Sequence, residues 1–260
     1  MDRIIPALPF AAGLFVGMLV CLEIGRRLGK YYLAKDPQGA TSGIGVVQGA
    51  VFSLFGLLVA FTFSGAPARL DARRHLIQEE ANAIGTAYLR LDLLSPEAQP
   101  ALREQFRTCV DSRLEAYRRF PDVEAAKAEL ARSAKLQTAI WTQVIAATRL
   151  PASNPDALKL LIPSLNGMID ISSTRTMSAR LHPPLIIFGL LFLLAPVCSL
   201  LAGYGMAGSK QRNWLHITAF AVIVVISVYV ILEIEYPRMG LLPVETAYDQ
   251  VLVELRESMR

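Results

Sequence analysis

Four long stretches of this chain contain no Asp, Glu, Lys or Arg. They cover residues 4–22, 43–65, 183–209 and 213–232, and each is 19 residues or longer. About 20 apolar residues are needed for a helix to cross the hydrocarbon core of a bilayer, and such a helix satisfies its own backbone hydrogen bonds there. We therefore expect an all-α polytopic membrane protein with four transmembrane helices, the first of which is retained and is not a cleaved signal peptide.

The charged residues are concentrated in the middle of the sequence. Of the 48 Asp, Glu, Lys and Arg residues, 29 lie between positions 66 and 182, where apolar residues recur at helical spacing. A helical-bundle domain inserted between spans two and three explains both features. The predicted parts are transmembrane helices 1 and 2 in residues 1–65, the extramembrane domain in 66–182, transmembrane helices 3 and 4 in 183–236, and an amphipathic C-terminal helix in 237–260.

Several function classes find no support in the composition or the motifs. The net charge is only +4, and no basic patch is interleaved with aromatic residues, which argues against nucleic acid as a partner. The sequence contains no C-x-x-C motif, nucleophile elbow, phosphate-binding glycine loop or metal-spaced cluster of His and Cys. We therefore expect no enzyme, no catalytic residue, no metal site and no cofactor.

The charges of the two short loops predict the orientation in the membrane. These loops carry Arg26, Arg27, Lys30 and Lys35 in the first and Lys210 and Arg212 in the second. Short loops rich in Lys and Arg stay in the cytoplasm, so the central domain would face outward into the periplasm. Arginines close to the membrane in the central domain favour the opposite orientation: Arg69, Arg73, Arg74, Arg175 and Arg180. The loop charges favour the outward orientation, and the other stays open.

Small residues line one face of the second span. They recur at three- or four-residue spacing: Gly45, Gly49, Ser53, Gly56, Ala60 and Ser64. Small side chains allow the close backbone approach on which helix association in lipid depends. We therefore expect this helix-packing seam to contact protein along its whole length. The sequence leaves open whether the seam packs on another span of the same chain or forms an interface between subunits.

A second stripe runs beside the seam at the same helical spacing. It consists of Phe52, Phe55, Val59 and Thr62, and it continues to Arg69 and Arg73. Around the axis of an oligomer, the first four residues would line a hydrophobic pore neck, and the arginines would attract anions at the pore mouth. Alternatively, the phenylalanines face lipid and the arginines are membrane-proximal anchors. The spans bury no charge at mid-membrane, which argues against a proton- or cation-coupled transporter.

Two stretches resemble a family of bacterial membrane proteins. Residues 49–61 (GAVFSLFGLLVAF) and 79–90 (EEANAIGTAYLR) resemble the DUF4239 proteins, which are described as bestrophin-like. The order of two spans, a helical domain and two spans is similar too. Bestrophins are homopentameric anion channels whose second-span helices line an axial pore with a phenylalanine-containing neck. The resemblance implies a homo-oligomer, specifically a pentamer, in the bacterial inner membrane, which conducts small anions such as chloride. It also favours the interpretation that Phe52, Phe55 and Val59 line the pore.

The chain also departs from bestrophins. It has none of their tryptophan- and arginine-rich signatures and no acidic cluster matching their calcium clasp, and their large domain is cytosolic. Two functions therefore compete. One is an oligomeric membrane channel that conducts anions along an axial pore lined by span two. The other is a non-conducting membrane sensor or scaffold whose helical domain binds a partner.

Overall fold

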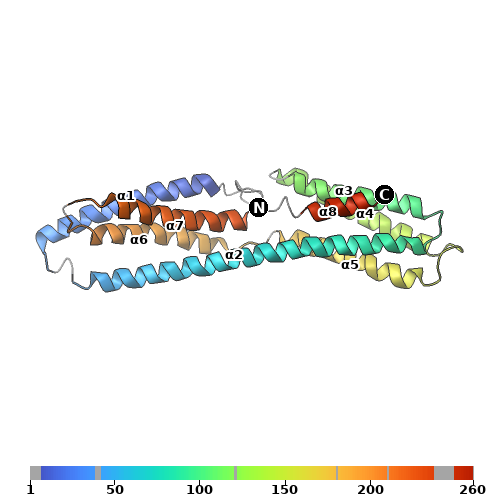
Figure 1. Ribbon diagram of the computed structural model, residues 1–260, viewed down its shortest axis with the longest axis horizontal. Coiled ribbons are helices and arrows are strands. Elements are labelled where there is room, and N and C mark those ends of the chain that lie inside the picture. Colours follow the sequence, from blue (N-terminus) through green and yellow to red (C-terminus); the bar gives the residue numbers. More distant parts are fainter. Residues whose placement is uncertain are drawn as a thin grey trace. The chain divides into compact units, whose positions relative to one another are not determined.

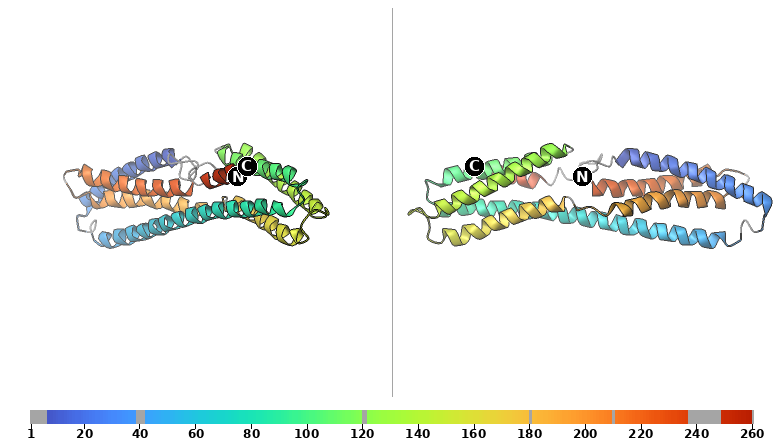
Figure 2. Two further views of the ribbon diagram at one scale, coloured as in Figure 1. Left: turned by 45° about the vertical axis from the view of Figure 1, so that its right-hand side comes forward. Right: turned by 180° about the vertical axis from the view of Figure 1, so that it is seen from behind.

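The computed structural model describes residues 7–38, 42–119, 122–179, 181–209, 211–236 and 249–259 (Figures 1 and 2). Within these residues the chain is helical and contains no strand, which confirms the all-α prediction. The elements are α1 (Ala7–Lys35), α2 (Ile44–Leu89), the 3-10 helix η1 (Arg90–Leu93), α3 (Gln99–Arg118), α4 (Val123–Ala147), α5 (Ala157–Ser178), α6 (Leu185–Gly205), α7 (Trp214–Glu235) and α8 (Gln250–Ser258).

Helices α1, α2, α6 and α7 cover most of the four uncharged stretches and are long and apolar enough to cross a membrane. The prediction of four spans is thereby confirmed. Helix α7 begins where the side chain of Asn213 accepts a hydrogen bond from the backbone N–H of His216, the usual way to satisfy an unpaired amide at a helix start. Helix α2 passes through Pro67 without ending and continues to Leu89, well beyond its uncharged part.

The described residues form two compact units, which meet in the sequence within α2, between Leu70 and Asp71. The membrane unit comprises the described residues within 1–70 and 182–241. In it, α1, α6 and α7 lie side by side with the first part of α2 (Figures 1 and 2). Its apolar core includes Met18 of α1, Phe188 of α6 and Val228 of α7.

The extramembrane unit comprises the described residues within 71–181 and 242–260. Its core contains Tyr88 of α2, Phe106 of α3, Ile140 of α4 and Leu161 of α5. Helix α8 completes this core, because Leu252 is fully buried in it. Only part of the predicted C-terminal helix corresponds to α8, since residues 237–248 lie outside the described residues.

Two glycines allow the backbones of α1 and α6 to touch. A Cβ atom placed on Gly25 would lie 1.9 Å from the carbonyl oxygen of Leu200, and one placed on Gly203 would lie 2.0 Å from the carbonyl oxygen of Leu22. Neither position can accept a side chain without moving a helix. This is the close backbone approach that small residues permit in membranes, but it joins α1 to α6, whereas the sequence pattern drew attention to α2.

Gly203→Ala should destabilise the membrane unit, because the added methyl group overlaps a backbone oxygen that cannot rotate away. Overpacking of this kind costs about 1–3 kcal/mol. The matched control is Gly189→Ala, also in α6, where an added Cβ would meet no atom within 4 Å. Thermal unfolding of the detergent-solubilised protein, followed by tryptophan fluorescence, should show a lower midpoint for Gly203→Ala only. Equal midpoints for the two variants would contradict the proposed contact.

Candidate functional site

The membrane-spanning part of α2 presents one buried face and a broad exposed surface. Phe55, Thr62 and Ala66 lie on the buried face, with exposed fractions of 6%, 7% and 0%. Only 6% of the apolar window of α2 is buried, against 28% for α1, 28% for α6 and 39% for α7. Of the four spans, α2 therefore has the most surface available to lipid or to another protein.

The stripe that was predicted to line a pore faces the interior of its own unit. Phe55 belongs to the apolar core, and the ring of Phe52 lies 6.2 Å from the ring of Phe220 in α7. Val59 packs against the same core, and the hydroxyl of Thr62 donates to the carbonyl oxygen of Leu58 at 2.7 Å. Within the single chain Phe55 and Thr62 are therefore buried, and Phe52 and Val59 are half-buried. The pore-lining role of these residues stays a prediction. The lipid-facing alternative is wrong for Phe55, because its ring is buried in the core between the spans.

Of the two arginines predicted at the pore mouth, Arg69 forms an ion pair within the chain and Arg73 is buried. The guanidinium Nη2 of Arg69 lies 2.8 Å from Oε2 of Glu235, a carboxylate with no exposed surface. The second carboxylate oxygen of Glu235 lies 3.1 Å from Nδ1 of His182, whose ring stacks on Tyr236. Arg73 is buried, with an exposed fraction of 8%. The charge of Arg69 is therefore compensated within the chain.

The predicted helix-packing seam lies on the exposed surface of α2. Its six members, Gly45, Gly49, Ser53, Gly56, Ala60 and Ser64, are all exposed. A Cβ atom placed on any of the three glycines would meet no atom within 4 Å. Packing against another span of the same chain, one of the two alternatives, is therefore not observed. The interface between subunits stays a prediction.

The exposed surface of α2 divides into two strips of different character. Beside the small residues runs a strip of large apolar side chains, including Val46, Leu54, Leu57 and Phe61, with exposed fractions of 79%, 58%, 53% and 69%. Large apolar side chains suit contact with acyl chains, whereas small ones favour close approach of a second helix. The two strips therefore suit different neighbours.

Phe55→Ala distinguishes a core role from a pore-neck role. If Phe55 fills the core, the substitution opens a cavity and lowers the free energy of unfolding by about 3 kcal/mol or more. The control is Phe61→Ala on the exposed strip, which should leave the melting temperature nearly unchanged. A pore neck predicts the reverse for Phe55→Ala: unchanged thermal unfolding with increased ion flux through liposomes.

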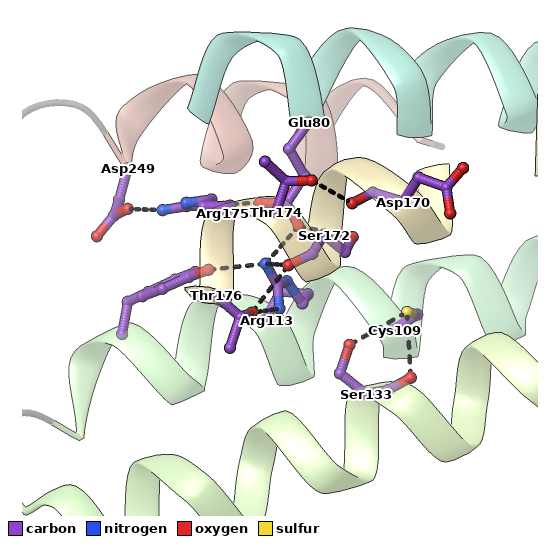
Figure 3. A network of polar contacts seen from close by, with 11 residues as sticks. Glu80, Cys109, Arg113, Ser133, Asp170, Ser172, Thr174, Arg175, Thr176 and Asp249 are labelled. Atoms are coloured by element: carbon purple, nitrogen blue, oxygen red, sulfur yellow. Dashed lines mark hydrogen bonds and ion pairs between the residues drawn. The ribbon is translucent and has the colours of Figure 1, made fainter. Parts of the chain in front are cut away.

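A buried ionic network lies in the extramembrane unit (Figure 3). At its centre is Glu80 of α2, which has no exposed surface. One of its carboxylate oxygens lies 2.5 Å from Nη2 of Arg113 in α3, and the other lies 2.6 Å from Nη1 of Arg175 in α5. The hydroxyl of Ser172 donates to the first oxygen at 2.8 Å. One carboxylate thus joins three helices.

The network extends from the two arginines to the segment before α8. Arg175 donates to Asp249 at 2.9 Å, and its guanidinium lies 3.8 Å from the ring centre of Tyr117. Arg113 donates to the hydroxyl of Tyr117 at 2.7 Å and to the hydroxyl of Thr176 at 3.2 Å. Two cations and two carboxylates balance each other, which is the arrangement that buried charges require.

The environment keeps Glu80 ionised. Burial raises the pKa of its carboxyl group. The charges of Arg113 and Arg175, together with hydrogen bonds from Arg175 and Ser172, lower the pKa, and their combined effect is the larger one. The pKa of Glu80 therefore lies below the ordinary value of 4.5. A group with a lowered pKa stabilises the folded state fully above pH 4.5, and this contribution is lost as the pH falls through the folded-state pKa. Glu80 therefore acts as a fixed anion at neutral pH.

Glu80→Ala should strongly destabilise the extramembrane unit, because it leaves two buried arginines without their shared carboxylate. Breaking a buried pair on one side costs about 3–5 kcal/mol. Its neighbour provides the control: Glu79 is 46% exposed and pairs only with His75 among the described residues, so Glu79→Ala should change stability by less than about 0.5 kcal/mol. Thermal unfolding of both variants at neutral pH tests this, and a similar midpoint for the two would contradict the assigned role.

A groove of about 300 Å³ on the extramembrane unit is a second candidate binding surface. It is lined by Asn82, Ala83 and Thr86 of α2, Arg90 of η1, and Pro163, Ser164 and Gly167 of α5. The residues that the structure describes contain no group of three or more His, Cys, Asp or Glu side chains placed to hold a metal ion.

A comparison with protein families gives one result. The family model of the bestrophin-like domain matches residues 14–248, most of the chain. No curated protein matches the chain, and no solved structure matches it.

Proposed function

This chain belongs to the bestrophin-like family, and from that membership together with the exposed seam of α2 we propose that it is a homo-oligomeric membrane channel. The observation that carries the proposal is the seam itself: six small residues in a row that no part of the described chain covers. A membrane helix gains little from placing such a surface against acyl chains. A second copy of the chain supplies the missing contact.

The proposed assembly places α2 close to the symmetry axis. A ring of subunits is built from head-to-tail contacts between two different surfaces of the same chain. The small residues of α2 would contact the next subunit and approach the axis, and the strip containing Leu54 and Phe61 would face lipid. The wall near the axis then includes the hydroxyl groups of Ser53 and Ser64, which can donate hydrogen bonds to an anion.

Conduction of small anions such as chloride is the finer part of the proposal. It is supported by the likeness to bestrophins and by the available hydroxyl donors. It draws no support from Arg69, whose charge is compensated by Glu235. A pentamer, residence in the bacterial inner membrane and an outward-facing central domain belong to the same proposal, as does the absence of an enzymatic role.

The first experiment measures the number of subunits and then the flux. The wild-type protein in mild detergent should appear as a species larger than a dimer by mass photometry, and in liposomes it should release chloride. Gly49→Leu combined with Gly56→Leu should reduce both the oligomer and the flux, because bulky side chains separate the backbones at the seam. The result should be a loss of at least tenfold in flux.

The matched control adds bulk to the other strip of α2. Val46→Leu combined with Leu57→Phe should leave both the oligomer and the flux unchanged. A wild-type monomer or dimer leaves no central axis and overturns the channel proposal. If the small-residue variant keeps its oligomer and flux, the seam is not the interface.

A non-conducting sensor or scaffold is the second candidate, and the groove on the extramembrane unit favours it. Two exposed leucines lie near the groove: Leu89 directly precedes Arg90 in the sequence, and the carbonyl oxygen of Leu160 accepts a hydrogen bond from Arg90 at 2.7 Å. Their exposed fractions are 68% and 44%. Apolar side chains beside polar groups are typical of a surface that binds another protein. Oligomers with no measurable chloride flux would support this function over the channel.

A further inference from the structure

Helix α1 is longer than a membrane crossing requires. It has 29 residues, which at a rise of 1.5 Å per residue gives a length of about 43 Å, against about 30 Å for the hydrocarbon core. The uncharged stretch ends at Leu22. The rest of the helix, from Glu23 to Lys35, therefore lies at the depth of the lipid headgroups or just beyond it.

The surface of this segment mixes apolar and basic side chains. Ile24, Leu28, Tyr31 and Tyr32 have exposed fractions of 44%, 42%, 54% and 51%. Between them in the sequence stand Arg27, Lys30 and Lys35, all exposed. Aromatic rings and long basic side chains are the groups that occupy the boundary between acyl chains and headgroups.

The surrounding contacts leave this face with an excess of positive charge. Arg27 and Arg212, from the loop between α6 and α7, share one carboxylate, that of Glu23, at 2.9 and 3.1 Å. Among the described residues no carboxylate is paired with Lys30, and Lys35 lies over the ring of Tyr31 at 4.3 Å. Arg26 is buried and donates to the carbonyl oxygen of Ser209. The exposed face carries four cations: Arg27, Lys30, Lys35 and Arg212. The carboxylates are those of Glu23 and Asp36.

We propose that the exposed face of residues 23–35 is a binding surface for anionic phospholipid headgroups, in which Arg27, Lys30 and Lys35 contact the lipid phosphate while Leu28, Tyr31 and Tyr32 insert among the neighbouring chains. Charge complementarity selects an anionic headgroup over a zwitterionic one. The exposed apolar side chains select a lipid over a free phosphate, because a soluble anion would leave them in water. The inference does not depend on oligomerisation or conduction.

The test compares phosphatidylglycerol with phosphatidylcholine of identical acyl chains. The full-length protein in mixed micelles of each lipid is examined by native mass spectrometry for bound lipid and by thermal unfolding for stabilisation. Each cation near an anionic surface contributes a roughly fivefold preference. We expect wild-type protein to retain phosphatidylglycerol at least tenfold better than phosphatidylcholine. The triple variant Arg27→Gln, Lys30→Gln, Lys35→Gln should lose most of that preference.

A control variant removes the same charge elsewhere. Lys127→Gln, Arg132→Gln and Lys159→Gln alter side chains of the extramembrane unit that are 50%, 59% and 79% exposed, and this variant should keep the wild-type preference. Equal retention of the two lipids by wild-type protein, or equal loss in both variants, overturns the proposal. Stabilisation by inorganic phosphate alone that matches the effect of the lipid overturns the assignment to a lipid. If the α1 variant keeps the wild-type preference, this face of α1 is not the binding surface and the proposal is overturned.

Discussion

The direct backbone contact between α1 and α6 determines how the membrane unit is arranged. Gly25 and Gly203 bring the two helices so close that no side chain fits between them, and α7 packs against the same pair. Helices α1, α6 and α7 therefore pack mainly on one another. Helix α2 contributes Phe55 to their common core, and no described part of the chain covers its small residues.

The two units are stabilised by different physical means. In lipid, apolar side chains gain little from leaving one apolar environment for another, so association depends on close packing, and glycine provides it. In the extramembrane unit, the hydrophobic effect stabilises an apolar core. Within this unit, the ion pairs of Glu80 fix the relative placement of α2, α3 and α5. A buried ion pair adds little net stability over an apolar replacement, but a misplaced helix would leave a buried charge unpaired. The network therefore selects one packing of the helices.

The sequence predicted the four spans because segregation of charge is unambiguous. It could not predict which face of α2 is buried, because apolar residues suit lipid and protein core equally well. Helical spacing shows which residues share a face of the helix, but it does not show what that face contacts. The sequence therefore did not indicate that Phe55 packs into the core of its own chain. The contact of Gly25 with α6 was missed because Gly25 lies beside charged residues, outside the uncharged stretch. Glu80 was missed because its partners lie in other helices, far along the sequence.

The pairing of Arg69 with Glu235 restricts how a channel built from this chain could select ions. Glu235 has no exposed surface, so separating it from its arginine would leave an unpaired buried charge. Arg69 cannot hold Glu235 and also offer an uncompensated charge to a passing anion. In the proposed channel, selection would then come from the exposed small-residue face of α2, where the groups available are serine hydroxyls and small side chains. Such a wall discriminates by pore width and by the cost of removing water from the ion, which predicts weak preference among small anions and exclusion of large ones.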